Sequence, residues 1–414
     1  MERQLAELAE ARARNYALVQ VDSVFVGLVA VAGTFLPVFL IRLGASGTEV
    51  GLLTSLPALT AFLLAIPAGR WLQRRPNIVP WYSRLRLAAW LGYAGMALAV
   101  QALPASAAVP AVLAVWAAAS LPSTAALVAF PVVMDGAAGP RGRFDLLGRR
   151  WAIAGVATTA GVLVAGQALG MLPFPANFEL LLGGCALAGV ASFGVSRGIV
   201  IPDQIVARNG PRVAIRAQLG GFVRLIRGRA TFLAYELRAF VFTVGIGLAV
   251  PLLPLLYVNE IAAPNWWIGV VGAAQSVGAV AGYLTARRMS HRRGAAAVLL
   301  PSMLVAGLAP AIVALLHALP VVAGMALVSG LAMAGTQLGL FNELMKRVPR
   351  EHGVTFSSVD QTLQNLALIV APSIGGLLAV TIGVRSGLAV ASAVALLGFG
   401  MFLRDWRGGP AATT

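Results

Sequence analysis

The sequence predicts an all-α membrane protein with twelve transmembrane helices in two pseudo-symmetric six-helix bundles. Three observations predict this class. Hydrophobic residues make up 59% of the 414 residues and charged residues only 11%, whereas a typical soluble domain is about a quarter charged. Apolar runs long enough to cross a bilayer recur along the whole chain. Finally, landmarks of the first half return in the same order in the second half.

The apolar runs are expected to be helices, because lipid offers no partner to backbone groups that lack hydrogen bonds within the segment. A run of about 20 residues crosses the hydrocarbon core as a helix. Short joints that are charged or rich in Pro and Gly separate the runs. The twelve expected spans are 17–42, 47–70, 80–103, 107–134, 148–172, 178–197, 231–257, 265–287, 295–316, 318–345, 354–380 and 384–403.

The repeat between the two halves rests on matching landmarks. Pro37 lies late in an apolar run, as Pro254 does in the second half. The spacing within Gly51–Gly69 equals the spacing within Gly269–Arg287. Repeats of this kind are typical of membrane proteins built from two parallel halves.

The longest joint between apolar runs predicts how the chain is divided. Residues 209–211 form a turn signal, and the apolar residues that follow are interleaved with arginines. This pattern is typical of an amphipathic helix lying on a membrane surface. We therefore expect an N-terminal bundle over 1–200, a cytoplasmic linker with an amphipathic helix over 201–230, and a C-terminal bundle over 231–414.

The net charge of +16 does not indicate nucleic-acid binding, because the basic residues follow the expected topology. With the N-terminus inside, all of the 31 Lys and Arg residues except Arg42 and Arg385 fall at cytoplasmic ends or loops. This asymmetry is the positive-inside pattern. It predicts a multi-pass protein of the cytoplasmic (inner) membrane, with both termini in the cytoplasm and anionic lipids at the basic face.

The sequence lacks the motifs of the common enzyme and metal-site classes. It contains no nucleophile elbow, P-loop or zinc motif. Its three histidines are scattered without metal-ligand spacing, and Cys185 is the single cysteine. We expect neither an enzyme nor a bound cofactor or metal.

A basic segment follows the second apolar run of each half. The first copy includes Gly69, Gln73, Arg74 and Arg75, and the second includes His291, Arg292 and Arg293. Together with twelve spans and two like halves, these segments resemble the major facilitator superfamily over essentially the whole chain. The family pattern here runs Gly-x-Leu-x-Asp-Arg, followed by Gly and basic residues.

The chain departs from that pattern at the acidic position, where Gln73 and His291 replace the family's Asp. In the family this carboxylate helps to lock one conformation. The resemblance therefore implies a divergent member, whose two basic segments act as conformational switches with a weaker lock.

Polar side chains inside the expected spans are the candidate substrate-binding and coupling groups, because ionisable groups in a bilayer are costly and face a cavity or a partner. The candidates are Gln20, Asp22, Glu236, Arg238, Gln337, Asp360 and Gln364.

Two of these groups suggest a contact between the halves. When the two halves are aligned at Pro37 and Pro254, Asp22 falls one alignment position from Arg238. In the major facilitator superfamily, which the chain resembles, the first and seventh spans face each other. We expect an Asp22–Arg238 contact near the cytoplasmic side. The sequence also allows Arg238 to pair locally with Glu236.

Asp360 is the expected proton-coupling group. It shares a helical stripe with Gln364, and a carboxyl that moves between apolar and basic surroundings can take up and release a proton. The alternative is a carboxylate held by helix-end donors and by loop arginines such as Arg350.

The resemblance implies a monomeric secondary transporter that works by alternating access on a small-molecule substrate. Because the central spans offer mainly amides, hydroxyls and apolar surface, a neutral, amphipathic or lipophilic substrate is favoured, with coupling to protons. Two alternatives stay open. One is a lipid or lipophile translocator without proton coupling, and the other is a non-transporting protein that assembles with a membrane partner.

Overall fold

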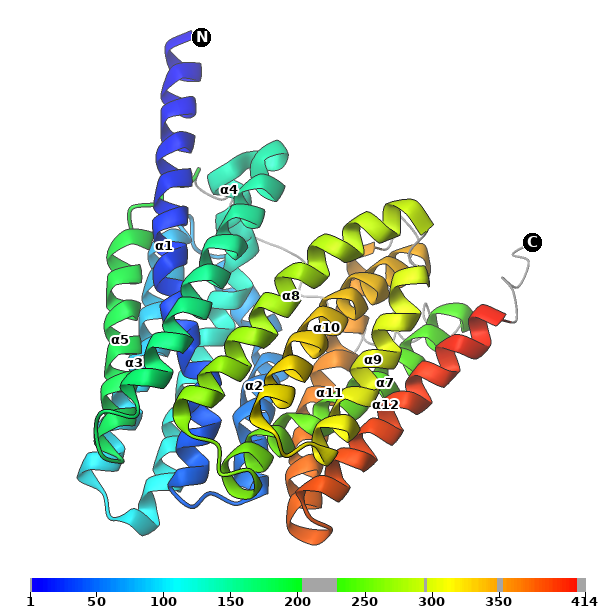
Figure 1. Cartoon of the computed structure of the whole chain (residues 1–414). Coiled ribbons are helices and arrows are strands. Elements are labelled where there is room, and N and C mark those ends of the chain that lie inside the picture. Colours follow the sequence, from blue (N-terminus) through cyan, green and yellow to red (C-terminus); the bar gives the residue numbers. More distant parts are fainter. Residues whose placement is uncertain (1, 203–228, 294–295, 348–352, 408–414) are drawn as a thin grey trace. The chain divides into compact units, whose positions relative to one another are not determined.

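The computed structural model describes residues 2–202, 229–293, 296–347 and 353–407. In these ranges the chain is helical and forms no strands. In chain order the helices are α1 (Glu2–Arg42), α2 (Gly47–Leu72), α3 (Val79–Ala102), α4 (Ala105–Ala168), α5 (Ala176–Ser196), α7 (Ala230–Leu255), the π-helix η1 (Leu256–Glu260), α8 (Asn265–Arg293), α9 (Ala296–Leu315), α10 (Leu319–Arg347), α11 (Gly353–Thr381) and α12 (Val384–Arg407) (Figure 1).

Helix α4 contains two of the predicted spans, because its backbone breaks at Gly139. This residue has φ 70° and ψ 170°, a conformation that favours glycine, which has no Cβ. The break separates the segments Ala105–Gly139 and Asp145–Ala168, each long and apolar enough to cross a membrane. With α4 divided in this way, the twelve predicted helices are all present.

Eleven of these helices have the length and composition of a membrane span among the described residues. The remaining one is α3, which corresponds to the predicted span 80–103. Its length is sufficient, but Ser83, Arg84 and Arg86 lower its hydropathy. Large apolar side chains such as Leu63, Val156 and Leu397 lie exposed on the helices, as expected of surfaces that face lipid. The chain is a multi-pass membrane protein.

The helices group into two compact units. Unit 1 contains residues 1–44, 59–209 and 264–273, and unit 2 contains residues 45–58, 210–263 and 274–414. Helices α2 and α8 therefore contribute to both units. The predicted bundle boundaries at residues 200 and 231 stay predictions, since the linker and its expected amphipathic helix lie mostly outside the described residues.

Each unit has its own apolar core. In unit 1, α1 and α3 pack against α4 and α5, and Tyr82, Met134 and Leu146 are fully buried. In unit 2, α7 packs against α11 and α12, while α9 packs against α10 and α12. Phe242 and Met303 lie in that core.

Close approach of α7 and α11 in unit 2 depends on glycine. A Cβ on Gly375 would lie 2.1 Å from the backbone oxygen of Leu248, and a Cβ on Gly247 would lie 2.8 Å from the Cβ of Ala371. Small residues let membrane helices approach closely. The two glycines let α11 approach α7 closely, and polar residues of both helices line the same cavity.

Candidate functional site

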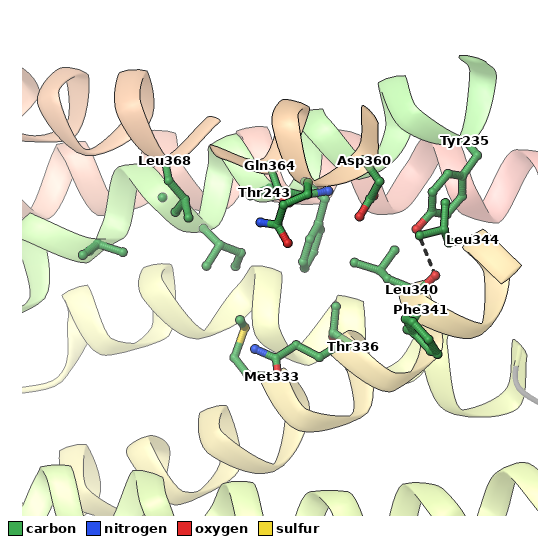
Figure 2. Close-up of a pocket in the computed structure, with 16 residues that line it drawn as sticks. Tyr235, Thr243, Met333, Thr336, Leu340, Phe341, Leu344, Asp360, Gln364 and Leu368 are labelled. Atoms are coloured by element: carbon green, nitrogen blue, oxygen red, sulfur yellow. Dashed lines mark hydrogen bonds between the residues drawn. The ribbon is translucent and has the colours of Figure 1, made fainter. Parts of the chain in front are cut away.

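Unit 2 contains a cavity of about 460 Å³ between α7, α10 and α11. Polar groups from all three helices line it: Thr243, Thr336, Gln337, Asp360, Gln361 and Gln364. Apolar side chains such as Phe242, Met333 and Leu368 complete the lining. In Figure 2, Thr243, Asp360 and Gln364 lie across the cavity from Met333 and Thr336.

The polar wall on α11 follows from helical spacing. Asp360, Gln364 and Leu368 are four residues apart, so they lie on one face of the helix, and all three line the cavity. Three of the predicted candidates, Gln337, Asp360 and Gln364, are thus brought together. Their roles in binding and coupling stay predictions.

Most amides and hydroxyls of this cavity have partners. The Thr243 hydroxyl donates to Gln364 Oε1 at 2.7 Å, and the Tyr283 hydroxyl lies 2.6 Å from Gln337 Oε1. Tyr235 donates to the backbone oxygen of Leu340 at 2.9 Å, the dashed line of Figure 2.

Thr336 is the exception within the cavity lining. Thr336 is only 2% exposed, and its hydroxyl has no hydrogen-bond partner among the described residues. Buried polar groups in native structures are normally hydrogen-bonded, so an unpartnered one needs an explanation. A role in binding a ligand would explain why this hydroxyl has no partner.

Glu236 lies on α7, beside the cavity-lining Tyr235. It is 2% exposed, and within the part of the chain that the structure describes neither carboxyl oxygen has a hydrogen-bond partner. Asp360 of α11 lines the same cavity as Tyr235. Arg238 does not neutralise Glu236, because Arg238 pairs with Asp405 of α12. The local Glu236–Arg238 pair that the sequence allowed is therefore not formed.

Asp22 belongs to a separate buried network in unit 1. Its Oδ1 pairs with Nη2 of Arg86 at 3.0 Å and accepts a hydrogen bond from Ser192. Arg86 also donates to Ser192 at 2.7 Å and to Tyr82 at 3.1 Å. Asp22 and Arg238 each have an ion-pair partner within their own unit, and the expected contact between them stays a prediction.

Sequence reasoning missed Arg86, which was counted with the charged cytoplasmic end of its span. A signal was present, since Tyr82, Arg86 and Trp90 are four residues apart on α3. The guanidinium carbon lies 4.8 Å from the Tyr82 ring centroid and 4.4 Å from that of Trp90. An Arg flanked by aromatic residues at this spacing indicates a partly desolvated cation. Gln20 is half-buried on α1 and takes no part in the described bonds of this network.

The first predicted switch segment is a turn at the end of α2. The backbone N–H of Gln73 donates to the oxygen of Gly69 at 2.9 Å. The guanidinium of Arg75 lies 5.1 Å from the ring of Trp71 and 4.7 Å from that of Trp81. The guanidinium of Arg75 therefore packs against two tryptophan rings.

The remaining basic residues of the two segments have different settings. Arg74 lies in the turn after α2. In the second copy, His291, Arg292 and Arg293 continue α8 to its last residue, and Arg292 is exposed. A switching role for either segment stays a prediction.

Within the described residues, no group of three or more His, Cys, Asp or Glu side chains could hold a metal ion. Cys185 is buried and free.

Residues 237–412 match the sequence model of the Major Facilitator Superfamily. A search of curated proteins gave no match. Among solved structures, a mutant of the nucleoside transporter NupG is 12% identical, with a TM-score of 0.76 over 94% of this chain and 99% of that chain.

Two further solved structures share the fold. A bacterial homologue of the iron transporter ferroportin, in the inward-facing state, is 16% identical, with a TM-score of 0.74 over 95% of this chain and 98% of that chain. A bacterial homolog of the human lysosomal transporter Spinster is 14% identical, with a TM-score of 0.66 over 96% and 97%.

The fold and the family match are those of membrane transporters and not of enzymes. The match over residues 237–412 and the shared fold support a divergent member of the major facilitator superfamily. The predicted fold class and resemblance are confirmed.

Proposed function

We propose that the protein is a secondary transporter that moves a small neutral, amphipathic molecule across the cytoplasmic membrane by alternating access, coupled to protons. The unit 2 cavity carries this proposal. Three helices supply amides and hydroxyls to it, and Asp360 is the single carboxyl among the described lining residues. No basic side chain is among them. A highly charged substrate would therefore lack compensating groups.

Both the size and the chemistry of the cavity favour such a substrate. Pockets for small molecules commonly measure about 300–1,000 Å³ and combine apolar walls with a few polar groups. Gln361 and Gln364 can donate and accept hydrogen bonds, and Thr336 has a hydroxyl to offer. Phe242 and Met333 favour an apolar face. The substrate we infer has hydrogen-bonding groups on one side and apolar surface on the other.

Nucleosides are a reasonable first probe, because they combine neutral charge, hydrogen-bonding groups and a flat apolar face. The similarity to a nucleoside transporter supports trying them. Other similar structures are a bacterial metal transporter and bacterial homologues of an iron transporter and of a lysosomal transporter, so the probe panel must be wider.

We also propose how the protein is oriented in the membrane and which lipids contact it. The charge asymmetry of the sequence supports an orientation with both termini in the cytoplasm and contact of the basic face with anionic lipids. We further propose a monomer, with two bundles joined by the 201–230 linker and with the basic segments at Gln73 and His291 as conformational switches.

The test is ligand-induced stabilisation of the detergent-purified protein. The panel contains uridine, adenosine, glucose, tetraphenylphosphonium and lysophosphatidylcholine. A ligand that binds the folded state at a hundredfold excess over its Kd stabilises it by about 2.7 kcal/mol. We expect stabilisation by a neutral solute, and a Kd raised about fivefold in Thr336→Val, since one hydrogen bond contributes about 1 kcal/mol.

Thr381→Val is the matched control, because the Thr381 hydroxyl is exposed and bonds within its own helix. It should leave the Kd unchanged. Stabilisation by the lipophilic cation or the lysolipid alone would contradict the neutral substrate and, for the lysolipid, favour the lipid translocator. No stabilisation by any probe, with a stoichiometric protein partner co-purifying, would favour the non-transporting alternative.

A further inference from the structure

The unexplained group in unit 2 is Glu236. It is only 2% exposed, and its two carboxyl oxygens have no hydrogen-bond donor in the described ranges. Removing an isolated carboxylate from water costs several kcal/mol even after the protein relaxes. The group must therefore be neutralised, either by a cation or by a proton.

The helices packed against α7 do not supply that cation among the described residues. Helix α9 carries no titratable side chain, and α11 carries only Asp360. The basic groups of α7, α10 and the start of α12 have other partners: Arg238 pairs with Asp405, Lys346 with Glu343, Arg347 with Glu343 and Asp405, and Arg385 with Glu260. Arg404 of α12 is exposed.

Asp360 adds a second acid instead. It lines the cavity together with Tyr235, the residue that precedes Glu236, and water can reach it from the cavity. Two neighbouring carboxylates repel each other when both are ionised, and such pairs commonly keep one proton between them.

We propose that Glu236 and Asp360 form a two-carboxyl site that holds one proton, with Asp360 in the cavity lining and Glu236 buried next to the lining residue Tyr235. The proton comes from cavity water, binds to a carboxyl oxygen and returns to water, and no other species is consumed. This inference rests on the proposed function, because the site would be the place where transport is coupled to protons. It adds Glu236 to Asp360 as a residue that determines the coupling ion.

A metal cation fits this pair less well. Hard cations such as Ca²⁺ take about six to eight oxygen ligands, and within the described residues no third acidic, His or Cys side chain joins the two carboxyls. A proton needs only one oxygen.

The site can be tested without a substrate, so a failure here is distinguishable from a failure of the proposed function. Infrared spectra of the detergent-purified full chain report protonated carboxyl groups through their carbonyl stretch. We expect one such band at neutral pH in the unmodified protein. It should be lost in Glu236→Gln and weakened in Asp360→Asn, where no neighbouring carboxylate opposes ionisation of Glu236.

Glu343→Gln is the matched control, because Glu343 is paired with Lys346 and Arg347 and should carry no proton. The band should persist in this variant. Glu236→Met, which keeps the bulk of the side chain without polar atoms, replaces Glu236→Gln if the latter fails to fold.

Three results would overturn the proposal. The first is a band that survives removal of Glu236, and the second is a band that disappears in Glu343→Gln. The third is a band that is removed when sodium chloride replaces choline chloride at constant pH, since this would make the pair a sodium site.

Discussion

The buried Asp22–Arg86 pair gives the sharpest test of the unit 1 structure. The two side chains are 1% and 7% exposed, so removing one charge leaves the other buried. Breaking a buried pair in this way costs about 3–5 kcal/mol, whereas replacing both partners by apolar groups is often close to neutral. We expect Asp22→Ala to lie near the lower end, because Ser192, Tyr82 and two rings still contact Arg86.

The reverse change, Arg86→Met, removes the ion-pair partner of Asp22 but keeps the hydrogen bond from the Ser192 hydroxyl, and it should cost about 4–5 kcal/mol. The double variant Asp22→Ala/Arg86→Met should lose less stability than either single variant. The assay is unfolding by dodecyl sulfate in mixed micelles, followed by circular dichroism.

Asp145→Ala supplies the control, since its pair with Arg149 is more than half exposed. Exposed pairs contribute less than about 1 kcal/mol. A double variant whose loss equals the sum of the single losses would refute the reasoning, because two independent sites give additive effects.

Two further predictions concern unit 2. Gly375→Ala places a Cβ 2.1 Å from the backbone oxygen of Leu248 and should lower the free energy of unfolding by about 1–3 kcal/mol in the same assay. The control is Gly183→Ala, whose Cβ meets nothing within 4 Å and which should leave stability unchanged. Equal losses in the two variants would contradict the close packing of α7 and α11. Glu236→Met should retain or raise the melting temperature, because it removes an unpartnered buried acid; a large drop would show that the carboxyl makes a stabilising contact.

The fold could be predicted from the sequence, because long apolar segments enter the lipid and their backbone N–H and C=O groups must form hydrogen bonds within the segment. Both conditions require membrane-spanning helices. The span predicted at 80–103 is α3, Val79–Ala102, and Pro/Gly-rich joints marked most helix ends. Less accurate was the end of the span predicted at 107–134. Helix α4 continues through this region and breaks at Gly139, a local conformation that hydropathy does not encode.

The candidate site could be predicted only where the spacing of residues along one helix determines which side chains lie together. Asp360 and Gln364 share a stripe, and they line one cavity. The unpartnered hydroxyl of Thr336 depends on three helices meeting, and no pattern within α10 reveals it. The partner of Asp22 is 64 positions away on α3, so its identity depends on tertiary packing.

The most direct test of proton-coupled transport uses vesicles reconstituted with the full chain and loaded with a pH-sensitive dye. Uridine, adenosine, glucose, tetraphenylphosphonium and lysophosphatidylcholine are added outside one at a time, and both solute uptake and internal pH are recorded. We expect a neutral solute to enter together with a change of internal pH, and Asp360→Asn to abolish that change. Entry of the solute with no change of pH would contradict proton coupling, and the absence of uptake of every probe would contradict transport of a neutral solute of this kind.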